Sequence, residues 1–356
     1  MKPEPRKRAN TKSDRRKRAN LNDVARAAHT SVATVSRVLN HTGYFSERIS
    51  VRVQKAAERL NYQPNLRAKS LRQRRSNTIG LLIPNLLNQY YTALADDISQ
   101  LLHRRGYQLL LSSTRDDPGT EETALLQLVG HDVDGLIWVP AAADQKLVNI
   151  LLTRRIPAVS IVRRVDGNPF TTIVFEDFAG AQAATKHLLE LGHTRIGLIG
   201  GDVAHSSNHD RLKGYLKALQ EARIESDPGL IKMGSAVDNR GFVAAEELLQ
   251  LASPPTALFV ASNALMPSVM TCLRRHAVRI PEGISLICFD DLEWFMFSEP
   301  PISAIAINHT LLAEAAVDLL LNLVQNPDEM DEPPVFRQIS FDLLLRASTA
   351  ALRDPA

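Results

Sequence analysis

Short apolar runs alternate with longer amphipathic stretches along most of the chain, from Thr78 to the C-terminal region. The runs fall into two sets: TIGLLIP, QLLLSST, GLIWVP, AVSIV and TTIVF, and then RIGLIGG, ALFVAS, SLICFDD and ISAIAI. Continuous apolar strands separated by helices are typical of parallel sheets that are covered on both faces. The pattern therefore predicts an α/β body made of two doubly wound subdomains.

The last predicted helix, LLAEAAVDLLLNLVQN, and the last strand, VFRQISFDLLL, are expected to cross back between these subdomains. The first subdomain is then expected to comprise residues 77–176 and 309–327, and the second residues 177–308 and 328–346. Ligands of such folds bind beyond the carboxyl ends of the strands. The cleft between the subdomains is therefore the predicted ligand site.

Residues 20–64 have a different pattern, with three short helices and few large side chains. Asn20, Ser31 and Ser46 stand where they can cap these helices. Only AHT joins the first two helices, so they must cross steeply and pack closely, which indicates a helix-turn-helix. The exposed side of the second helix carries small apolar groups, hydroxyls and an arginine, which suit a DNA major groove: Val32, Ala33, Thr34, Ser36, Arg37 and Asn40. Periodicity alone does not exclude an unrelated three-helix bundle.

Charge is divided unevenly along the chain. Residues 1–75 hold 20 Lys and Arg against 5 Asp and Glu, whereas the remaining residues hold 22 against 34. A basic region of this size is expected to contact phosphates, while the acidic body should avoid a polyanion. Residues 1–19 are predicted to be a basic disordered tail, for which phosphate contacts and a solvated charge run both remain open.

Several classes of protein are disfavoured by the motifs. No apolar run of about 15 to 20 residues follows the N-terminal charges, so we expect neither a signal peptide nor a membrane span, and a cytoplasmic protein. The segment GLIGGD lacks the spacing of a dinucleotide site or a phosphate loop. His205 and His209 have no third metal ligand in view, and Cys272 and Cys288 are expected to be buried packing residues. We predict no catalysis, no cofactor and no metal.

The N-terminal motifs resemble those of a known family. The segment NDVARAAHTSVATVSRVLN, followed by LNYQPN and AKSLR, resembles the head of the lactose/galactose/purine repressor family of bacterial transcription factors. One departure is His29-Thr30, where family members often have Gly or Asn followed by Val. Because His tolerates unusual turn conformations, an altered turn within the same fold is expected. For the body, the resemblance implies the architecture of periplasmic sugar-binding proteins.

Residues 65–76 are predicted to be a hinge. They form a short basic stretch that Asn65 can cap, and a helix of this length is marginal alone. The resemblance implies that it folds on operator DNA, pairs with its dimer mate in the minor groove and inserts Leu71 between base steps, with Arg72 beside it. A protease-sensitive linker is the alternative.

The resemblance also implies an effector site in the cleft. Its arginine falls on Arg211, its asparagine on Asn263 and its acid on Asp290, with Asp291 next to it. Asn263 precedes Ala264 where the family usually has Asp. The other implied positions are a rim of polar side chains, a position where some relatives use an aromatic, and two residues after the first strand: His205, Ser207 and His209, then His309, then Tyr90 and Tyr91. The alternatives are surface positions for the rim histidines, helix packing for one tyrosine and capping for Asp290.

These residues favour a polar effector. Arg211 with up to three histidines favours a sugar acid such as a gluconate or ketogluconate, with a neutral sugar close behind and a purine less expected. We therefore expect an effector-responsive repressor that binds a palindromic operator as a homodimer, since no leucine heptad for a tetramer follows LLLRASTAALRDPA. The alternatives are a DNA-binding regulator with an unresponsive cleft and, less expected, a ligand-binding protein without DNA function.

Overall fold

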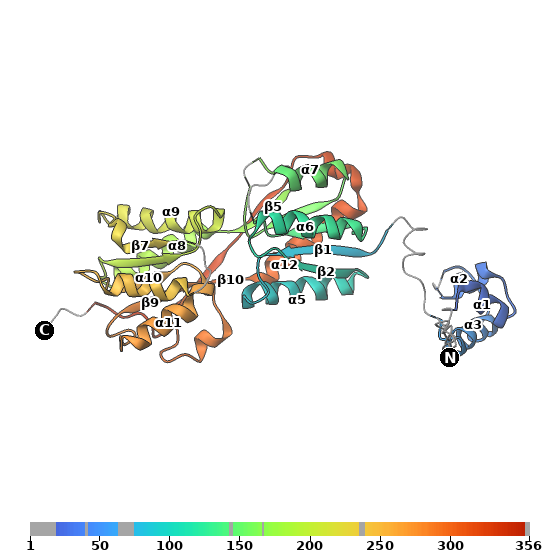
Figure 1. Cartoon of the computed structure of the whole chain (residues 1–356), viewed down its shortest axis with the longest axis horizontal. Coiled ribbons are helices and arrows are strands. Elements are labelled where there is room, and N and C mark those ends of the chain that lie inside the picture. The colour runs from blue at the N-terminus through green and yellow to red at the C-terminus, as the bar shows by residue number, and fades with distance from the viewer. Residues whose placement is uncertain are drawn as a thin grey trace, which may run out of the picture. The chain divides into compact units, whose positions relative to one another are not determined.

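The structure, a computed structural model, describes residues 19–39, 42–62, 75–141, 145–165, 167–234 and 239–352. The chain divides into two compact units, residues 1–74 and residues 75–356 (Figure 1). Most of the predicted hinge and tail lie outside the described residues.

The first unit is a bundle of three helices, α1 (Leu21–Ala27), α2 (Val32–Leu39) and α3 (Glu47–Arg59). The Asn20 side chain accepts from the backbone amides of Asn22 and Asp23, and the Asp23 carboxylate accepts from the Asn20 amide. This reciprocal cap fixes the start of α1. Ser31 caps α2 by accepting from the Thr34 amide at 3.1 Å, whereas Ser46 makes no side-chain capping bond at α3.

The core of the first unit is built from small side chains. Val24 and Ala28 of the α1 region, Val35 and Val38 of α2, and Val53 of α3 are at most 1% exposed. In the turn between α1 and α2, His29 adopts a left-handed backbone with φ of 44°, a conformation that Gly and Asn favour, and the expected difference from the family's turn stays a prediction. Arg52 of α3 donates to the His29 carbonyl at 3.3 Å and so ties this turn to the third helix.

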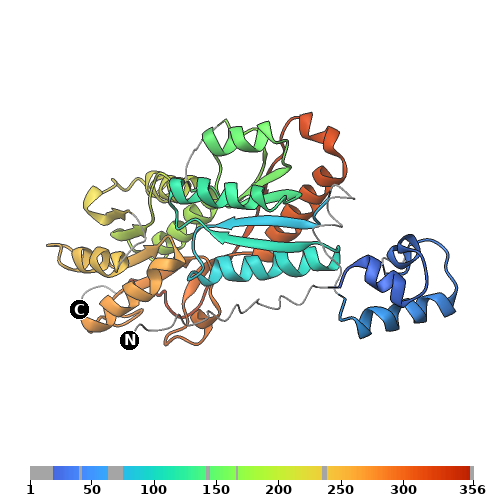
Figure 2. The ribbon, with the colours of Figure 1, turned by 45° about the vertical axis from the view of Figure 1, so that its right-hand side comes forward.

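The second unit contains two six-stranded sheets. The first is entirely parallel, in the order β11-β5-β4-β3-β1-β2. Its strands are β1 (Thr78–Ile83), β2 (Gln108–Ser113), β3 (Gly135–Trp138), β4 (Ala158–Ile161), β5 (Thr171–Phe175) and β11 (Phe336–Ile339). Its helices are α5 (Gln89–Arg104), α6 (Pro118–Gly130), α7 (Gln145–Thr153) and α12 (His309–Gln325). Separate apolar cores lie under α5 with α12 and under α6 with α7, so both faces are covered; Figure 2 shows α5 alongside β1 and β2.

The second sheet has the order β12-β10-β9-β8-β6-β7, with β12 antiparallel. Its strands are β6 (Ile196–Gly200), β7 (Ile231–Met233), β8 (Ala257–Val260), β9 (Ser285–Phe289), β10 (Ser303–Ile307) and β12 (Phe341–Leu344). Its helices are α8 (Asp177–Glu190), α9 (Ser206–Glu221), α10 (Arg240–Leu249) and α11 (Met266–Arg275). Short 3-10 turns add η1 (Pro228–Leu230), η2 (Asn263–Leu265), η3 (Glu293–Met296) and η4 (Pro327–Asp331).

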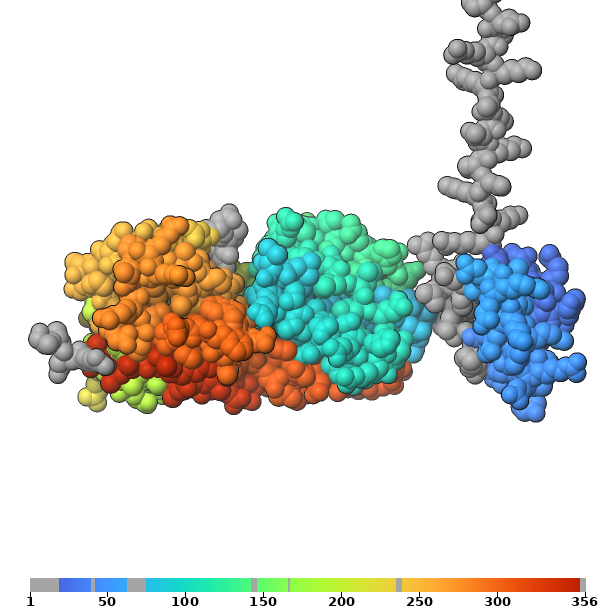
Figure 3. Space-filling view, turned by 90° about the horizontal axis from the view of Figure 1, so that it is seen from below, coloured from blue at the N-terminus to red at the C-terminus, as the bar shows by residue number. Residues whose placement is uncertain are grey.

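The chain passes between the two subdomains after β5, after β10 and after β11. The expectation that residues 328–346 belong entirely to the second subdomain is wrong, because β11 pairs with β5 of the first sheet and only β12 pairs with β10 of the second. The predicted single strand is therefore two short edge strands, and Ile339 of β11 packs into the first core. Figure 3 shows the orange surface of the second subdomain bordering the cyan surface of the first.

Candidate functional site

The outer side of α2 carries the residues predicted to read DNA. Ala33 and Arg37 are exposed, and Val32, Thr34 and Ser36 are partly exposed, while Val35 and Val38 on the other side are buried. The Thr34 and Ser31 hydroxyls are hydrogen-bonded to each other, with their oxygens 2.8 Å apart. Asn40, Leu71 and Arg72 lie outside the described residues.

A stripe of cations on α3 was not anticipated from the sequence. Four exposed basic residues follow one another at intervals of four, three and four positions: Arg48, Arg52, Lys55 and Arg59. Residues at this spacing share one face of a helix, so their charges add. The helical period of the basic positions was the available signal.

In the second subdomain, residues predicted for the effector site gather around a buried arginine. Arg211 of α9 is 5% exposed. Its Nε donates to Oδ1 of Asp177 at 2.7 Å, and its Nη1 donates to the carbonyl of Ala261 at 2.7 Å. Its guanidinium carbon lies 3.6 Å from the centre of the Phe289 ring, and Oδ1 of Asp290 lies 3.7 Å from Nη2. Arg211 therefore faces two carboxylates.

Burial raises the pKa values of the two carboxyl groups beside Arg211. Burial raises the pKa of Asp177 to about 6, against the opposing effect of Arg211. Burial also raises the pKa of Asp290, while Arg211 and the backbone amide of Asn263 act in the opposite direction. Asp290 is the first residue after the carboxyl end of β9 and has a left-handed conformation with φ of 72°.

The first subdomain contributes two tyrosines and a histidine. Asn88 caps α5 and so fixes Tyr90 and Tyr91 in its first turn, where both are buried. The Tyr90 ring meets the ring of His309, the first residue of α12, edge to face at 6.4 Å. Nδ1 of His309 lies 2.7 Å from Oδ2 of Asp97. Burial raises the pKa of Tyr90 well above its usual value, and Asp290 of the second subdomain raises it further, so these groups lie close enough to interact.

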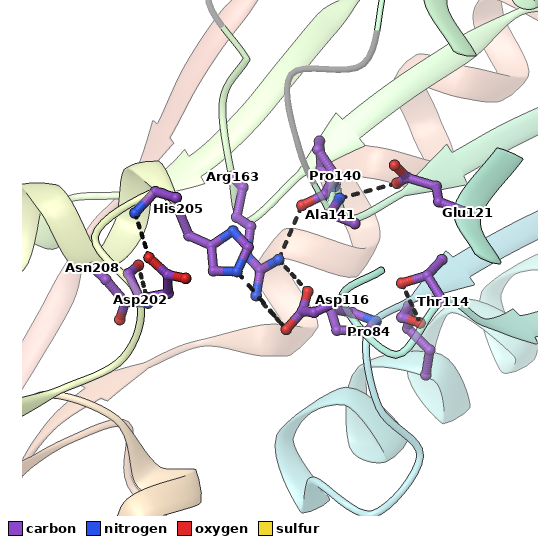
Figure 4. Close-up of polar contacts among 12 residues, drawn as sticks. Pro84, Thr114, Asp116, Glu121, Pro140, Ala141, Arg163, Asp202, His205 and Asn208 are labelled. Atoms are coloured by element: carbon purple, nitrogen blue, oxygen red, sulfur yellow. Dashed lines mark hydrogen bonds and ion pairs between the residues drawn. The ribbon is translucent and has the colours of Figure 1, made fainter. Parts of the chain in front are cut away.

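Arg163, directly after β4, is a cleft residue that the sequence reading missed. It is 7% exposed, and its Nη1 and Nη2 donate to the two carboxylate oxygens of Asp116 at 2.5 and 3.2 Å. Nη1 also donates to the Pro140 carbonyl, and Figure 4 shows the guanidinium beside the His205 ring. Burial, together with Arg163, lowers the pKa of His205. The position of Arg163 at the end of AVSIV was the available signal, because ligand sites lie at strand ends.

Two other predicted residues behave differently. Ser207 is buried on the same side of α9 as Arg211, but His209 is exposed. Because α9 starts at Ser206, residues two positions apart point to opposite sides, so His209 is not brought to the Arg211 cluster. The Asp291 carboxylate is bound by Arg346, whose two Nη atoms donate to it at 2.7 and 2.6 Å.

Four buried polar atoms near the cleft lack a hydrogen-bond partner among the described residues. They are the Tyr90 hydroxyl, Nε of Arg163, Nδ2 of Asn263 and Oδ1 of Asp290. Burying such groups unpaired is costly, so a native site that leaves them open calls for a ligand or water. Oδ1 of Asn263 is occupied, because Nδ2 of Asn88 donates to it across the cleft at 3.2 Å.

Within the described residues, no group of three or more His, Cys, Asp or Glu side chains could hold a metal ion. None of the described helices is both long and apolar enough to cross a membrane. Cys272 and Cys288 are buried and unpaired with each other.

A helix-turn-helix unit joined to two doubly wound subdomains, which bring buried polar groups together at their strand ends, defines a class of DNA-binding proteins with a ligand-binding body. Residues 20–65 match the family described as bacterial regulatory proteins, lacI family, and residues 185–349 match a periplasmic binding protein-like domain. The chain belongs to the lacI family of bacterial regulatory proteins, and it is a DNA-binding transcriptional regulator. The predicted family and fold class are confirmed.

Individual relatives match over most of their length. The HTH-type transcriptional repressor PurR of Haemophilus influenzae (strain PittEE) is 30% identical over 337 residues, which cover 94% of this chain and 99% of the relative. The ribose operon repressor of Escherichia coli (strain K12) is 33% identical, with coverage of 87% and 94%. Among solved structures, the lac repressor dimer bound to operator and the anti-inducer ONPF aligns with a TM-score of 0.83 at 27% identity, covering 94% of this chain and all of that one. The complex of the regulator CelR with cellobiose aligns with a TM-score of 0.70 at 27% identity, with coverage of 93% and 100%.

Proposed function

We propose that the protein is an effector-responsive repressor that binds a palindromic operator as a homodimer and controls genes of carbohydrate metabolism. The outer side of α2 enters the major groove, where Val32 and Ala33 contact thymine methyls, Thr34 and Ser36 contact phosphates or base edges, and Arg37 pairs with guanine. Asn40 is predicted to contribute to the same surface, whereas Leu71 and Arg72 belong to the predicted hinge, where Leu71 inserts between base steps of the minor groove. The basic stripe of α3 adds attraction for phosphates.

The observation that carries the effector role is the set of four buried polar atoms that have no hydrogen-bond partner among the described residues. Arg163 and Asn263 offer donors, Asp290 offers an acceptor, and the Tyr90 hydroxyl can do either. A ligand hydroxyl both donates and accepts, so a polyhydroxylated ligand satisfies all four. The effector site then comprises Tyr90, Tyr91, Arg163, His205, Ser207, Arg211, Asn263, Asp290 and His309.

The charges favour a neutral sugar over the sugar acid favoured by the sequence. Arg211 already faces Asp177 and Asp290, and Arg163 is paired with Asp116 on both of its terminal nitrogens. A lowered pKa leaves His205 uncharged near neutral pH. A ligand carboxylate would therefore compete with protein carboxylates for each of these arginines.

A thermal-shift screen of the purified full-length protein tests the effector role. The panel contains neutral sugars, sugar acids, phosphorylated sugars and purines. A ligand at about 100 times its Kd adds about 2.7 kcal/mol of stability, which is readily measured. We expect a neutral sugar to stabilise the wild type and the matched control His209→Ala, but not Asp290→Ala. If a purine or a sugar acid is the only compound that stabilises the protein, that class replaces the neutral sugar as the proposed effector.

A regulator with an unresponsive cleft is the second candidate, favoured by one contact. The Asn88–Asn263 hydrogen bond uses the Asn263 oxygen without any ligand, and Ala264 departs from the family pattern. No stabilisation by any class of the panel, together with intact operator binding, would favour this candidate.

The dimer proposal is supported by apolar side chains that are exposed in the single chain. Leu87 is 94% exposed, Phe297 80% and Met296 60%, and large exposed apolar groups are typical of interaction surfaces. Light scattering on the purified protein should give the mass of a dimer, and Phe297→Asp should shift it toward the monomer. A stable tetramer would contradict the proposal.

A further inference from the structure

Polar contacts between the two subdomains converge on the N-terminal part of α9. Arg164, three residues beyond the end of β4 at Ile161, belongs to the first subdomain, and Asp210 of α9 belongs to the second. Nη1 of Arg164 donates to Oδ2 of Asp210 at 2.6 Å, and Nη2 donates to Oδ1 at 3.0 Å. The backbone amide of Arg164 donates to Oγ of Ser206 at 2.8 Å. The same residue is thus held through both its side chain and its backbone.

This pair differs from an ordinary surface ion pair. A guanidinium that meets both oxygens of one carboxylate is fixed in distance and in angle, and such charge-assisted bonds are stronger than neutral ones. The Asp210 side chain is 17% exposed and the Arg164 side chain 36%, so solvent screens the pair only in part. A relative shift of about 1 Å between β4 and α9 lengthens both bonds beyond hydrogen-bond range.

Among the described residues, two other polar side-chain contacts between the subdomains are weaker. The Asn88–Asn263 bond joins two neutral amides at 3.2 Å. Nε2 of His205 lies 4.0 Å from Oδ2 of Asp116, which is too far for a hydrogen bond, and burial lowers the pKa of this histidine. Opening of the two subdomains must therefore break the Arg164 contacts, which are the strongest of the three.

We propose that Arg164, Asp210 and Ser206 form a clasp that holds the cleft closed before any effector binds. An effector shifts the equilibrium between the open and closed arrangements only by its difference in affinity for the two. The equilibrium constant without effector therefore sets how large that difference in affinity must be. The clasp fixes that starting balance from residues outside the effector contacts. It rests on the two-subdomain architecture and not on the identity of the effector.

The test measures the distance between the subdomains without ligand. Spin labels are placed on the full-length protein at Gln127→Cys in α6 and Lys213→Cys in α9, both exposed positions. Cys272 and Cys288 are fully buried and do not react with the label. Labelled chains are diluted with unlabelled protein, so that electron–electron resonance reports distances within one chain.

We expect a single short distance in the wild type. Arg164→Ala should add a longer distance and raise the open-to-closed ratio about threefold to tenfold, which lies in the lower part of the range expected for coupled residues in contact. Asp210→Ala should do the same, and the double variant should open the cleft no further than either single variant. Ser206→Ala, a surface change that leaves the ion pair intact, should produce a smaller shift in the same direction.

A matched control removes an ion pair of the same kind that does not join the two subdomains. Arg195 pairs with Asp227 inside the second subdomain at 3.4 Å, so Arg195→Ala should leave the distance distribution unchanged. The clasp is overturned if Arg164→Ala gives the wild-type distribution, if Arg195→Ala opens the cleft equally, or if the effects of the two clasp variants add in full. Because no effector is used, these outcomes are independent of the proposed effector role.

Discussion

The helix-turn-helix unit and the cleft present their functional groups in opposite ways. On α2 the groups proposed to read DNA are small, outward-facing and within a few positions of one another, over a core of valines and alanines. In the cleft, Arg211 is buried and depends on Asp177, Ala261 and Asp290, which lie far from it in sequence. Removing a group from the first surface should cost binding alone, whereas removing one from the second should cost folding as well.

Arg211→Ala should give the largest effect. Without the guanidinium, Asp177 and Asp290 remain as buried carboxylates with no cation between them, and breaking a buried pair in this way costs about 3–5 kcal/mol. Urea denaturation of the full-length protein should show this loss. A loss below about 1 kcal/mol would mean that the buried cluster is not the support we infer.

Arg37→Ala should give the complementary result. An arginine that pairs with guanine contributes about 1–3 kcal/mol of discrimination, so operator affinity should fall roughly tenfold or more. The urea midpoint should stay at the wild-type value, because Arg37 is exposed. Fluorescence anisotropy with labelled operator gives the affinity. If Arg37→Ala lowers the urea midpoint without weakening DNA binding, Arg37 supports folding and not DNA recognition, which would contradict the comparison.

The pH dependence of stability separates the two regions further. The pKa of Asp177 is raised to about 6 from a usual value of 3.8, so the folded protein holds this proton more tightly than the unfolded chain. Its contribution to stability is therefore fully present below about pH 4 and is lost as pH rises through 6. Relative to Asp177→Asn, the wild type should lose stability across this interval. Parallel pH profiles for the two proteins would contradict the assignment.

The smallest expected effect concerns the turn of the helix-turn-helix. His29 holds a φ of 44°, a conformation that glycine adopts at lower cost than other residues. His29→Gly should therefore raise the stability of the first unit by up to about 1 kcal/mol, without changing operator affinity. Circular dichroism melts of the full-length protein detect the change, and a lower melting temperature would show that the His29 side chain supports the turn.

Local pattern explains which parts could be predicted. The capping of α1 by Asn20, the apolar strands and the strand-end position of Asp290 all follow from neighbouring residues, and the structure contains each of them. Asp177 was missed because its importance comes from a partner 34 residues away, which no short-range pattern records. Arg163 was missed although it follows the strand AVSIV, and only its pairing with Asp116, 47 residues away, lies outside any local pattern.

The errors have the same origin. His209 was placed at the cleft because the segment before Arg211 was treated as a loop, whereas α9 starts at Ser206 and turns His209 outward. The division of residues 328–346 between two sheets depends on which edge strand each half meets. The preference for a sugar acid weighed Arg211 and three histidines against Asp290 and Asp291 but not against Asp177 and Asp116, and it stays a prediction beside the neutral sugar proposed above.

The central claim is that occupation of the cleft changes DNA binding. The direct test is an anisotropy titration of operator DNA, selected from random sequence by the full-length protein, with and without the ligand found in the thermal-shift screen. The account predicts that saturating ligand changes the operator affinity of the wild type at least about tenfold, within the usual range of allosteric coupling, and leaves that of Asp290→Ala unchanged. Equal affinities with the wild-type cleft empty and saturated would contradict it.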